Sequence, residues 1–442
     1  MSSPYKTVAF HTLGCKLNFA ESSTMSNQFK AKGYAILDFQ EVADLYVINT
    51  CSVTENANKK ARKIIRRTLR KAPLAKIAVV GCYAQLNPEE IAQIPGVSLI
   101  VGAGEKFNLI EQIEKIELNN TPKIINSKIE HLTDFNPSNS SFERTRSFLK
   151  IQDGCNYNCS FCTIPLARGK SRSAEINSTI LEVNKIAETD IREIVFTGVN
   201  IGDFGLNHNE NLIQLIQECD KINGIDRYRI SSIEPNLLTD EIIEFVASSN
   251  KFLPHFHIPL QSGSDRILGL MKRRYKTDLY RDRINNIKSK IPTACIGVDV
   301  IVGFPSENDD HFKQTYDFLQ ELDISYLHVF SYSKRDNTIA AKMDLQVPDQ
   351  IKIKRSMILR SLSDKKRRSF YQSQIGLDKT VLYEAENKKG YIYGYTENYI
   401  RVRSAWNPEL ANKLVLVKIK SIDNEGFVRV EEKLKEEFLI SV

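Results

Sequence analysis

The 442-residue sequence has little that would place the protein in a membrane or outside the cell. It contains no run of about 18 apolar residues, which is what a transmembrane helix needs. Its first residues, Met-Ser-Ser-Pro-Tyr-Lys, lack the apolar core of a secretory signal. We therefore expect a cytoplasmic protein with no membrane contact. Its eight cysteines then stay reduced, which favours metal binding or catalysis over disulfides.

Strong overall charge is also lacking, since the formal net charge is only +7. A polyanionic partner must therefore be argued from where the positive charges cluster. The segment Lys59–Lys71 has eight basic residues among thirteen and no acidic one. Its spacing suits a helix with an apolar stripe, and the opposite basic face is either simply solvated or holds nucleic-acid phosphates. A second basic stretch, 346–375, reads as one helix after Pro348.

Three cysteines form the tightest motif, Cys155-x3-Cys159-x2-Cys162, and no fourth Cys or His follows at the spacing of a zinc site. Three thiolates can hold a [4Fe–4S] cluster, which normally takes four cysteines, so one iron stays open to a small molecule. A zinc knuckle and a disulfide are the alternatives. The missing fourth ligand argues against zinc, and the reducing compartment argues against a disulfide.

Three more cysteines follow predicted strands near the N-terminus. Residues 1–118 alternate apolar runs with helical stretches, which indicates a doubly wound parallel sheet. Cys15, Cys51 and Cys82 each come just after such a run. Ligand sites in these sheets form beyond the carboxyl ends of the strands, so we expect the three thiols to converge on a second cluster. Unrelated buried thiols are the alternative here, and we assign Cys219 and Cys295 to the core.

The rest of the chain divides into three parts. Residues 119–145 are polar and lack periodicity, as in a linker. Residues 146–375 predict a partial barrel of six strands, followed by the basic helix. Residues 376–442 predict a small antiparallel β-barrel of five strands, of the oligonucleotide-binding type. The fold class is therefore α/β with a terminal β-barrel.

Polar clusters follow four of the six central strands, where a barrel of this kind carries its chemistry. From these clusters we select six candidate cofactor contacts: Gly198, Asn200, Ser232, Glu234, Gln261 and Ser262. Each cluster alone is also compatible with ordinary turn chemistry.

The cysteine loop, with Phe161 before its last cysteine, resembles the signature of radical S-adenosylmethionine (SAM) enzymes. From about Thr7 onward the chain resembles the radical SAM methylthiotransferases. The resemblance is carried by the blocks Leu13-Gly-Cys-Lys16, Asn49-Thr-Cys-Ser-Val-Thr54, Gly81-Cys-Tyr-Ala-Gln85, Arg168-Gly-Lys-Ser-Arg-Ser173, His257-Ile-Pro-Leu-Gln-Ser-Gly263 and Asp299-Val-Ile-Val-Gly-Phe-Pro305. One departure is Asn337, where the family usually has glycine. Asparagine tolerates the left-handed backbone that a glycine would supply.

The resemblance implies two [4Fe–4S] clusters, a radical SAM barrel and a C-terminal RNA-binding barrel of TRAM type. One SAM methylates a sulfur on the N-terminal cluster, and a second yields the radical. The implied partners are tRNA, contacted at its anticodon stem-loop, and an electron donor such as flavodoxin or ferredoxin. We expect a monomer. In the terminal barrel, six residues could stack on and pair with unstacked bases: Tyr391, Tyr393, Tyr395, Tyr399, Arg401 and Arg403. The alternative is that these alternating aromatic rings simply fill one face of a strand.

The block Thr12-Leu-Gly-Cys-Lys-Leu-Asn18 with Glu21 and Ser22 is most similar to the branch that acts on N6-threonylcarbamoyladenosine at tRNA position 37. That nucleoside carries a carboxylate, for which we name Arg168, Arg273 and Arg335 as candidate ligands. Cofactor contact or a structural ion pair is the alternative for these arginines. The alternatives for the whole protein are methylthiolation of N6-isopentenyladenosine or of a ribosomal-protein aspartate, and a non-catalytic iron–sulfur RNA-binding protein.

Overall fold

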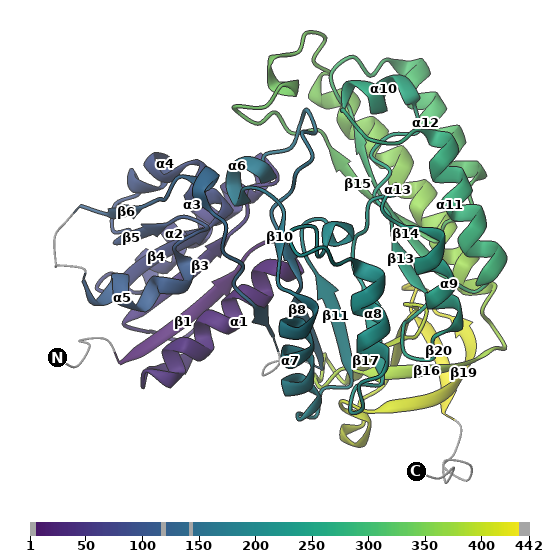
Figure 1. The fold of residues 1–442 in the computed structure, drawn as a ribbon, viewed down its shortest axis with the longest axis horizontal. Helices are drawn as coiled ribbons and strands as arrows, with labels where there is room; N and C mark the ends of the chain where they lie inside the picture. Colours follow the sequence, from purple (N-terminus) through teal and green to yellow (C-terminus); the bar gives the residue numbers. More distant parts are fainter. Residues whose placement is uncertain (1–5, 116–120, 141–144, 433–442) are drawn as a thin grey trace.

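The structure is a computed structural model that describes residues 6–115, 121–140 and 145–432. The predicted bounds of the N-terminal part, the linker and the terminal barrel extend in part beyond these residues. Figure 1 shows the N-terminal sheet on the left, the central strands and helices beside it, and the terminal strands at the lower right. Among the helices of the described ranges, none has both the length and the apolar character that a membrane span requires.

The N-terminal sheet has six parallel strands in the order β2-β1-β3-β4-β5-β6. Their bounds are β1 Thr7–Thr12, β2 Ala35–Leu37, β3 Leu45–Thr50, β4 Lys76–Gly81, β5 Leu99–Val101 and β6 Lys123–Ile125. One face packs against α2 (Glu55–Lys71) through Ala61 and Ile65. The other packs against α1 (Lys16–Ala31) and α5 (Leu109–Glu114). Helices on both faces confirm the doubly wound prediction.

The segment expected to be a linker contains two short strands. β6 extends the first sheet by pairing with β5, and β7 (Ser138–Asn139) pairs with the first central strand, β8 (Arg146–Lys150). The segment therefore adds an edge strand to each of two sheets. Strands of two or three residues are too short for an alternating apolar pattern, which explains why the sequence gives no sign of them.

The central part has the six predicted parallel strands. Their bounds are β8 Arg146–Lys150, β11 Glu193–Thr197, β12 Arg227–Ile230, β13 His255–His257, β14 Cys295–Val302 and β15 Tyr326–Ser331. Single bridges, Tyr228 to Phe252 and Ser232 to His257, connect the two halves of this array. The helices between the strands are α7 Ile176–Ala187, α8 Leu212–Asp220, α9 Asp240–Ser248, α10 Asp265–Leu270, α11 Thr277–Lys290 and α12 Asp309–Glu321. This is an open partial barrel, and its largest apolar core lies between strands and helices.

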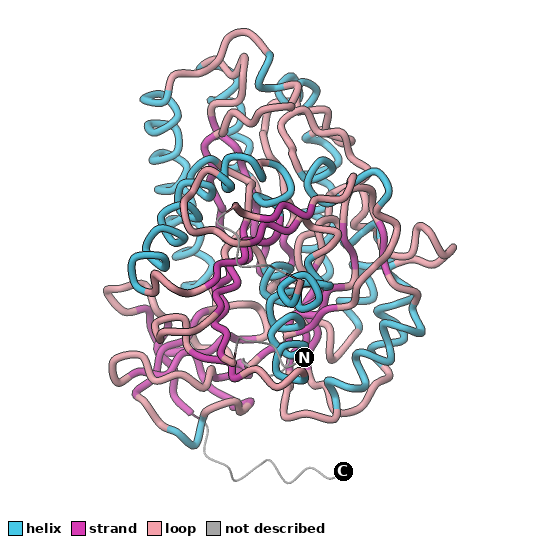
Figure 2. The backbone as a smooth tube through the Cα atoms, turned by 90° about the vertical axis from the view of Figure 1, so that its left-hand side faces the viewer, coloured by secondary structure: helices cyan, strands magenta, loops and turns pink. Residues whose placement is uncertain are grey.

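The long helix α13 (Asp349–Gln372) covers β15 and leads into a closed five-stranded barrel. The barrel strands are β16 Asp378–Tyr383, β17 Tyr391–Thr396, β18 Arg401–Ala405, β19 Leu414–Ile422 and β20 Val428–Glu432. The prediction of an antiparallel barrel was wrong in one detail. On one side β20 pairs antiparallel with β19, and on the other side it closes the barrel by pairing in parallel with β18 at Val402 and Val428. In the view of Figure 2, turned by 90°, these strands gather in the lower part of the molecule.

Candidate active site

The three-cysteine loop follows β9 (Gln152–Asp153) at the carboxyl end of β8. Gly154 makes the turn with a φ of +68°, and a Cβ there would lie 2.0 Å from the carbonyl oxygen of Lys170, so only glycine fits. Phe161 packs edge-on against Phe304 and fixes the loop to the barrel. The backbone N–H of Cys155 also donates to the Gly169 carbonyl at 3.0 Å. The loop is thus held rigidly at both ends.

Each thiol of this loop accepts a hydrogen bond. The backbone N–H of Tyr157 donates to the sulfur of Cys155 at 3.3 Å, and that of Ile164 donates to the sulfur of Cys162 at 3.4 Å. The guanidinium of Arg273 donates to the sulfur of Cys159 at 3.1 Å. Burial raises the pKa of Cys155 and Cys162 to about 12. Donors aimed at the sulfurs favour the thiolate form that a metal needs, so this set of three fits an iron–sulfur cluster.

The N-terminal cysteines meet at one edge of the first sheet. Cys15 follows β1, Cys51 follows β3, and Cys82 follows β4, and these three strands are direct neighbours. Gly14 has a φ of +112°, and a Cβ there would lie 2.7 Å from the Cβ of Cys51, so glycine is needed for this approach. Burial, together with the nearby Cys82 and Cys15 thiols, raises the pKa of Cys51 to about 12. Three thiols around one point also fit a cluster.

These thiols differ in accessibility. Cys82 is buried and Cys51 half-buried, whereas the side chain of Cys15 reaches solvent. Protein atoms nevertheless surround Cys15 closely enough to raise the pKa of its thiol. The second cysteine site is therefore enclosed and opens at Cys15. The two remaining cysteines, Cys219 and Cys295, are buried in apolar cores, as predicted.

The short helix α6 (Ile164–Arg168) connects the two cysteine sites. It begins two residues after Cys162 and packs against α3 (Cys82–Leu86), which begins with Cys82. Its last residue, Arg168, interacts electrostatically with Cys82, Cys15 and Cys51. The helix α6 therefore runs from the first cysteine site to the second.

Arg168 is buried in a network of ion pairs. Its guanidinium contacts the carboxylates of Glu21 at 3.0 Å and Asp153 at 2.9 Å, and the side-chain oxygen of Asn18 at 2.7 Å. Three further cations complete the network: Lys106, Lys150 and Arg172. The Nη1 and Nη2 atoms of Arg168 donate four hydrogen bonds to these acceptors, so its burial and pairing favour a structural role over a substrate contact.

The other two candidate arginines also have acidic partners. Arg273 pairs with Glu234 as well as with Cys159. Arg335 donates to Ser52 at 2.8 Å and contacts Glu55 at 3.2 Å, which connects the loop after β15 to the loop after Cys51. This contact lines a cavity of about 260 Å³. Asn337, on the same cavity, has a φ of +66°, so asparagine does adopt the left-handed turn.

The candidate cofactor residues occupy the ends of three neighbouring strands. Gly198 and Asn200 follow β11, where the side-chain oxygen of Gln152 accepts the backbone N–H of Asn200 at 2.8 Å. The side-chain oxygen of Asn200 is buried without a hydrogen-bond partner. A buried acceptor of this kind fits a donor from a bound molecule.

The remaining candidates differ in orientation. The hydroxyl of Ser232 contacts Nδ1 of His257 at 2.5 Å, and Glu234 faces Arg273. Gln261 has a φ of +70° and forms a single parallel bridge with Val300 of β14. Ser262 is fully buried against Thr315 of α12, so it supports the loop from below.

Sequence reasoning missed a polar group inside the barrel. Nε2 of His257 contacts Asp299 at 2.9 Å, and the ring of His328 lies 5.4 Å from that of His257. Lys16, next to Cys15, interacts electrostatically with His328 and with Arg146 and Arg229 of the barrel. His257 and Asp299 each begin a block that carries the family resemblance, which was the available signal in the sequence.

The tyrosines of the terminal barrel fall into two groups. Tyr395 and Tyr399 stack on each other at 4.7 Å and lie against Arg146 and Arg229 of the central barrel. Tyr391 and Tyr393 instead lie beside basic residues of their own barrel, Arg403 and Arg401. Only the second group fits the predicted base-stacking surface.

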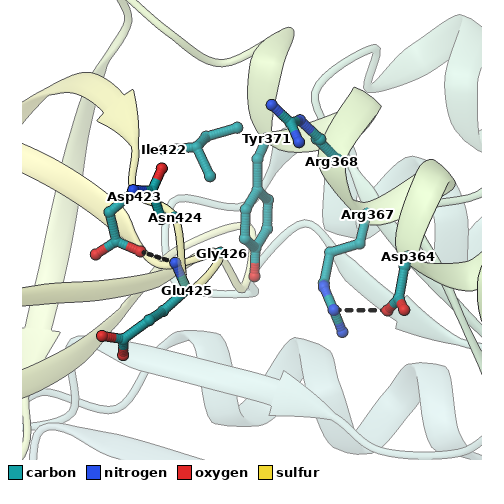
Figure 3. A pocket seen from close by; sticks show the side chains of 9 residues that line it. All are labelled: Asp364, Arg367, Arg368, Tyr371, Ile422, Asp423, Asn424, Glu425 and Gly426. Atoms are coloured by element: carbon teal, nitrogen blue, oxygen red, sulfur yellow. Dashed lines mark hydrogen bonds and ion pairs between the residues drawn. The ribbon is translucent and has the colours of Figure 1, made fainter.

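A further hollow of about 330 Å³ lies between α13 and the turn after β19. Figure 3 shows Tyr371 at its centre, with Arg367 turned toward Asp364 and Asp423 on the opposite wall. Both signs of charge are present, and none of the cysteines lines this hollow. It marks the contact between the helix and the terminal barrel.

A partial parallel barrel with three thiols at its carboxyl edge defines the class of radical SAM enzymes. Residues 149–319 match the radical SAM superfamily, and residues 7–102 match the uncharacterized protein family UPF0004. The fold is similar to that of the radical SAM methyltransferase TsrM from Kitasatospora setae, with a TM-score of 0.54 and 14% identity over 74% of this chain and 75% of that one.

Two curated relatives cover nearly the whole chain. The threonylcarbamoyladenosine tRNA methylthiotransferase MtaB of Bacillus subtilis is 40% identical over 98% of this chain and 99% of its own. The protein of the same name from Aquifex aeolicus is 39% identical over 93% of this chain and 100% of its own. The chain belongs to the threonylcarbamoyladenosine tRNA methylthiotransferase family.

Proposed function

We propose that this protein methylthiolates C2 of N6-threonylcarbamoyladenosine at position 37 of tRNA, giving the 2-methylthio derivative. The observation that carries the proposal is the pair of three-cysteine sites that α6 connects. A methylthio group needs both a sulfur source and a means of activating a C–H bond. Two adjacent cluster sites, in a chain 40% identical to an enzyme named for this substrate, provide for both.

Each cysteine site has its own role. Cys155, Cys159 and Cys162 would hold the [4Fe–4S] cluster that binds SAM. Cys15, Cys51 and Cys82 would hold the second cluster, which would supply the sulfur. When bound, the first cluster and SAM supply the radical that removes hydrogen from C2 of the base. The protein's part is to hold the three thiolates with Arg273 and two backbone donors, and to exclude water around them.

Five residues at the strand ends would hold SAM: Gly198, Asn200, Ser232, Glu234 and Gln261. The unpaired oxygen of Asn200 would accept a hydrogen bond from the cofactor there, and the half-buried Glu234, which pairs with Arg273, would bind its ammonium group. Ser262 supports this edge through its contact with Thr315. Arg335 connects the two halves of the site through Ser52 and Glu55 and remains a candidate substrate contact at the edge of its cavity.

The tRNA binds a surface that includes α2 and the terminal barrel. The exposed face of α2 carries seven basic side chains, and none of them forms an ion pair with an acidic residue in the part of the chain that the structure describes. They are Lys59, Lys60, Lys63, Arg66, Arg67, Arg70 and Lys71. Tyr391 and Tyr393, half-exposed beside Arg403 and Arg401, offer ring faces for unpaired bases.

The chain divides into three domains, residues 1–118, 146–375 and 376–442, and residues 119–145 connect the first two.

The protein works as a monomer in the cytoplasm and receives electrons from a small donor such as flavodoxin or ferredoxin. The test uses purified, reconstituted enzyme with SAM, a reductant and two anticodon stem-loops. One carries the threonylcarbamoyl group on adenosine 37 and the other the isopentenyl group. We expect methylthio product from the first. Product only from the isopentenyl substrate would refute the assignment and leave the enzyme class standing.

A further inference from the structure

One cavity, of about 260 Å³, borders segments that carry both cysteine sites. Thr163 on its wall directly follows Cys162. Leu86, also on its wall, ends the short helix α3 that begins with Cys82. The first turn of α2, which follows the loop of Cys51, provides further wall residues. A group held in this cavity would therefore lie close to both cysteine sites.

The segment after β15, which also lines this cavity, is hydrogen-bonded to both cysteine loops. The backbone N–H of Ala340 donates to the carbonyl of Ser160, inside the first cysteine loop, at 2.8 Å. The guanidinium of Arg335 donates to the hydroxyl of Ser52, next to Cys51, at 2.8 Å. Because both ends of the segment are held, its side chains keep fixed positions relative to both cysteine sites.

Arg335 has N–H groups that no protein atom uses. The residue is only 7% exposed, and its guanidinium has five N–H groups, of which one donates to Ser52 and one to Glu55. Its Nε atom is buried without a hydrogen-bond partner. The neighbouring Lys334 is exposed on the cavity wall and forms no ion pair with an acidic residue in the described ranges. A buried donor without a partner, beside an unpaired ammonium group, fits an anionic ligand.

The acidic side chains on the cavity wall are paired or exposed. Glu55 contacts Arg62 at 2.8 Å and Arg335 at 3.2 Å, and Glu90 also contacts Arg62. The third acidic residue, Asp336, is exposed. Apart from one leucine, every residue that lines the cavity has a polar or charged side chain. The cavity therefore offers cations to a carboxylate and oxygen acceptors to N–H and O–H groups, and it offers little to an apolar group.

We propose that this cavity receives the threonylcarbamoyl group of the substrate, and that Arg335 and Lys334 bind its carboxylate. The inference rests on the proposed function and deepens it, because it names the site that selects the N6 substituent. C2 of adenine and the carbon that bears N6 are both bonded to N1. A base whose C2 lies between the two cysteine sites therefore places its N6 substituent beside them, where this cavity lies.

The chemistry and size of the cavity match this group. The threonylcarbamoyl group has a carboxylate, a hydroxyl and urea N–H groups, whereas the isopentenyl group has no polar atom. The cavity volume of about 260 Å³ is smaller than the roughly 300–1,000 Å³ of sites that enclose a whole small-molecule ligand. It therefore suits one substituent of a base rather than the whole nucleoside.

The experiment compares two anticodon stem-loops that differ in one group. The first carries N6-threonylcarbamoyladenosine, and the second carries its neutral threonine-amide analogue. We expect the wild-type enzyme to favour the carboxylate by about tenfold to a hundredfold in kcat/KM, the range for hydrogen bonds to charged groups. Arg335→Gln should remove most of this preference. Lys334→Gln should lower kcat/KM by about twofold to fivefold for the carboxylate substrate alone, since solvent screens an exposed ammonium group. Lys334→Glu, which reverses the charge, should lower it further.

Two controls separate recognition of the carboxylate from damage to the fold. Iron content and the rate of 5′-deoxyadenosine release should be unchanged in the Lys334 variants, which decide the question even if Arg335→Gln does not fold. Lys342→Gln, an exposed lysine of the same segment that does not line the cavity, should behave as wild type on both substrates.

Three outcomes would contradict the inference. Equal losses on both substrates in the Lys334 variants would mean that this lysine contacts tRNA phosphates instead. A wild-type enzyme that treats the carboxylate and the amide alike would likewise overturn the inference. Both results leave the proposed function intact. No methylthio product from either stem-loop would overturn the inference and the proposed function together.

Discussion

Arg168 and Glu21 form a buried two-point ion pair, with Nη1 3.0 Å from Oε1 and Nη2 3.1 Å from Oε2. Arg168 ends α6, next to the radical SAM loop, and Glu21 lies on α1, which begins after Cys15. The pair therefore joins the elements that carry the two cysteine sites. Burial opposes ionisation of Glu21, but Arg168, Lys106 and Lys150 outweigh it and hold the pKa of this carboxylate well below its usual range.

Removing the carboxylate of Glu21 should lower the stability of the folded protein. Glu21→Ala leaves up to three buried cations without their shared partner, and such a loss costs about 3–5 kcal/mol. We expect the thermal unfolding midpoint to fall by several degrees, measured by circular dichroism under anaerobic conditions. The matched control is Glu111→Gln, an exposed glutamate on the same sheet's outer helix. A Glu21→Ala midpoint equal to that of the control would contradict the role of the network.

The iron content should report both cysteine sites. Two cubane clusters predict about eight irons per chain after anaerobic reconstitution. The triple substitution of Cys15, Cys51 and Cys82 by alanine should leave about four. Iron and protein assays check this, and Cys219→Ala, a core thiol, serves as the control. Full iron loading of the triple variant would exclude the N-terminal site.

The two sites should also separate functionally. Cys159→Ala removes a ligand of the first cluster, so we expect no reductive cleavage of SAM. Cys51→Ala should retain cleavage and yield 5′-deoxyadenosine, yet attach no sulfur to the tRNA. Chromatography of 5′-deoxyadenosine beside nucleoside analysis measures both outputs. A normal yield of methylthio product from Cys51→Ala would contradict separate roles for the two cysteine sites.

The basic face of α2 should contribute to tRNA affinity through phosphates. Lys63→Gln, at an exposed position, should weaken binding without changing base preference, and it should reduce the slope of log K against log salt by about one. Filter binding between low and moderate salt gives the slope. Lys185→Gln, an exposed lysine on α7, is the comparison. An unchanged slope in Lys63→Gln would mean that this face is only solvated.

Sequence patterns were sufficient where function depends on strand ends. Cys15, Cys51 and Cys82 converge because the strands before them are long, apolar and adjacent, and long apolar runs are what periodicity detects. The left-handed turn at Asn337 was likewise readable, since few residue types tolerate it. The predicted strands of the central barrel were all found for the same reason.

The contacts that join distant segments were beyond such patterns. Arg168 meets Glu21 across 147 positions, and Arg273 meets Cys159 across 114. The residues next to each arginine in the sequence do not show whether it forms an internal ion pair or is available to bind a substrate. The short β6 and the parallel closure of β18 with β20 also depend on packing rather than on periodicity.

The most direct test of whether this protein methylthiolates N6-threonylcarbamoyladenosine in tRNA is nucleoside mass spectrometry of tRNA from cells with and without it. We expect 2-methylthio-N6-threonylcarbamoyladenosine to disappear from the strain that lacks it, with N6-threonylcarbamoyladenosine rising in its place. The wild-type gene should restore the modification, and the Cys51→Ala gene should not. Unchanged 2-methylthio-N6-threonylcarbamoyladenosine in that strain, or loss of only the isopentenyl derivative, would contradict the account.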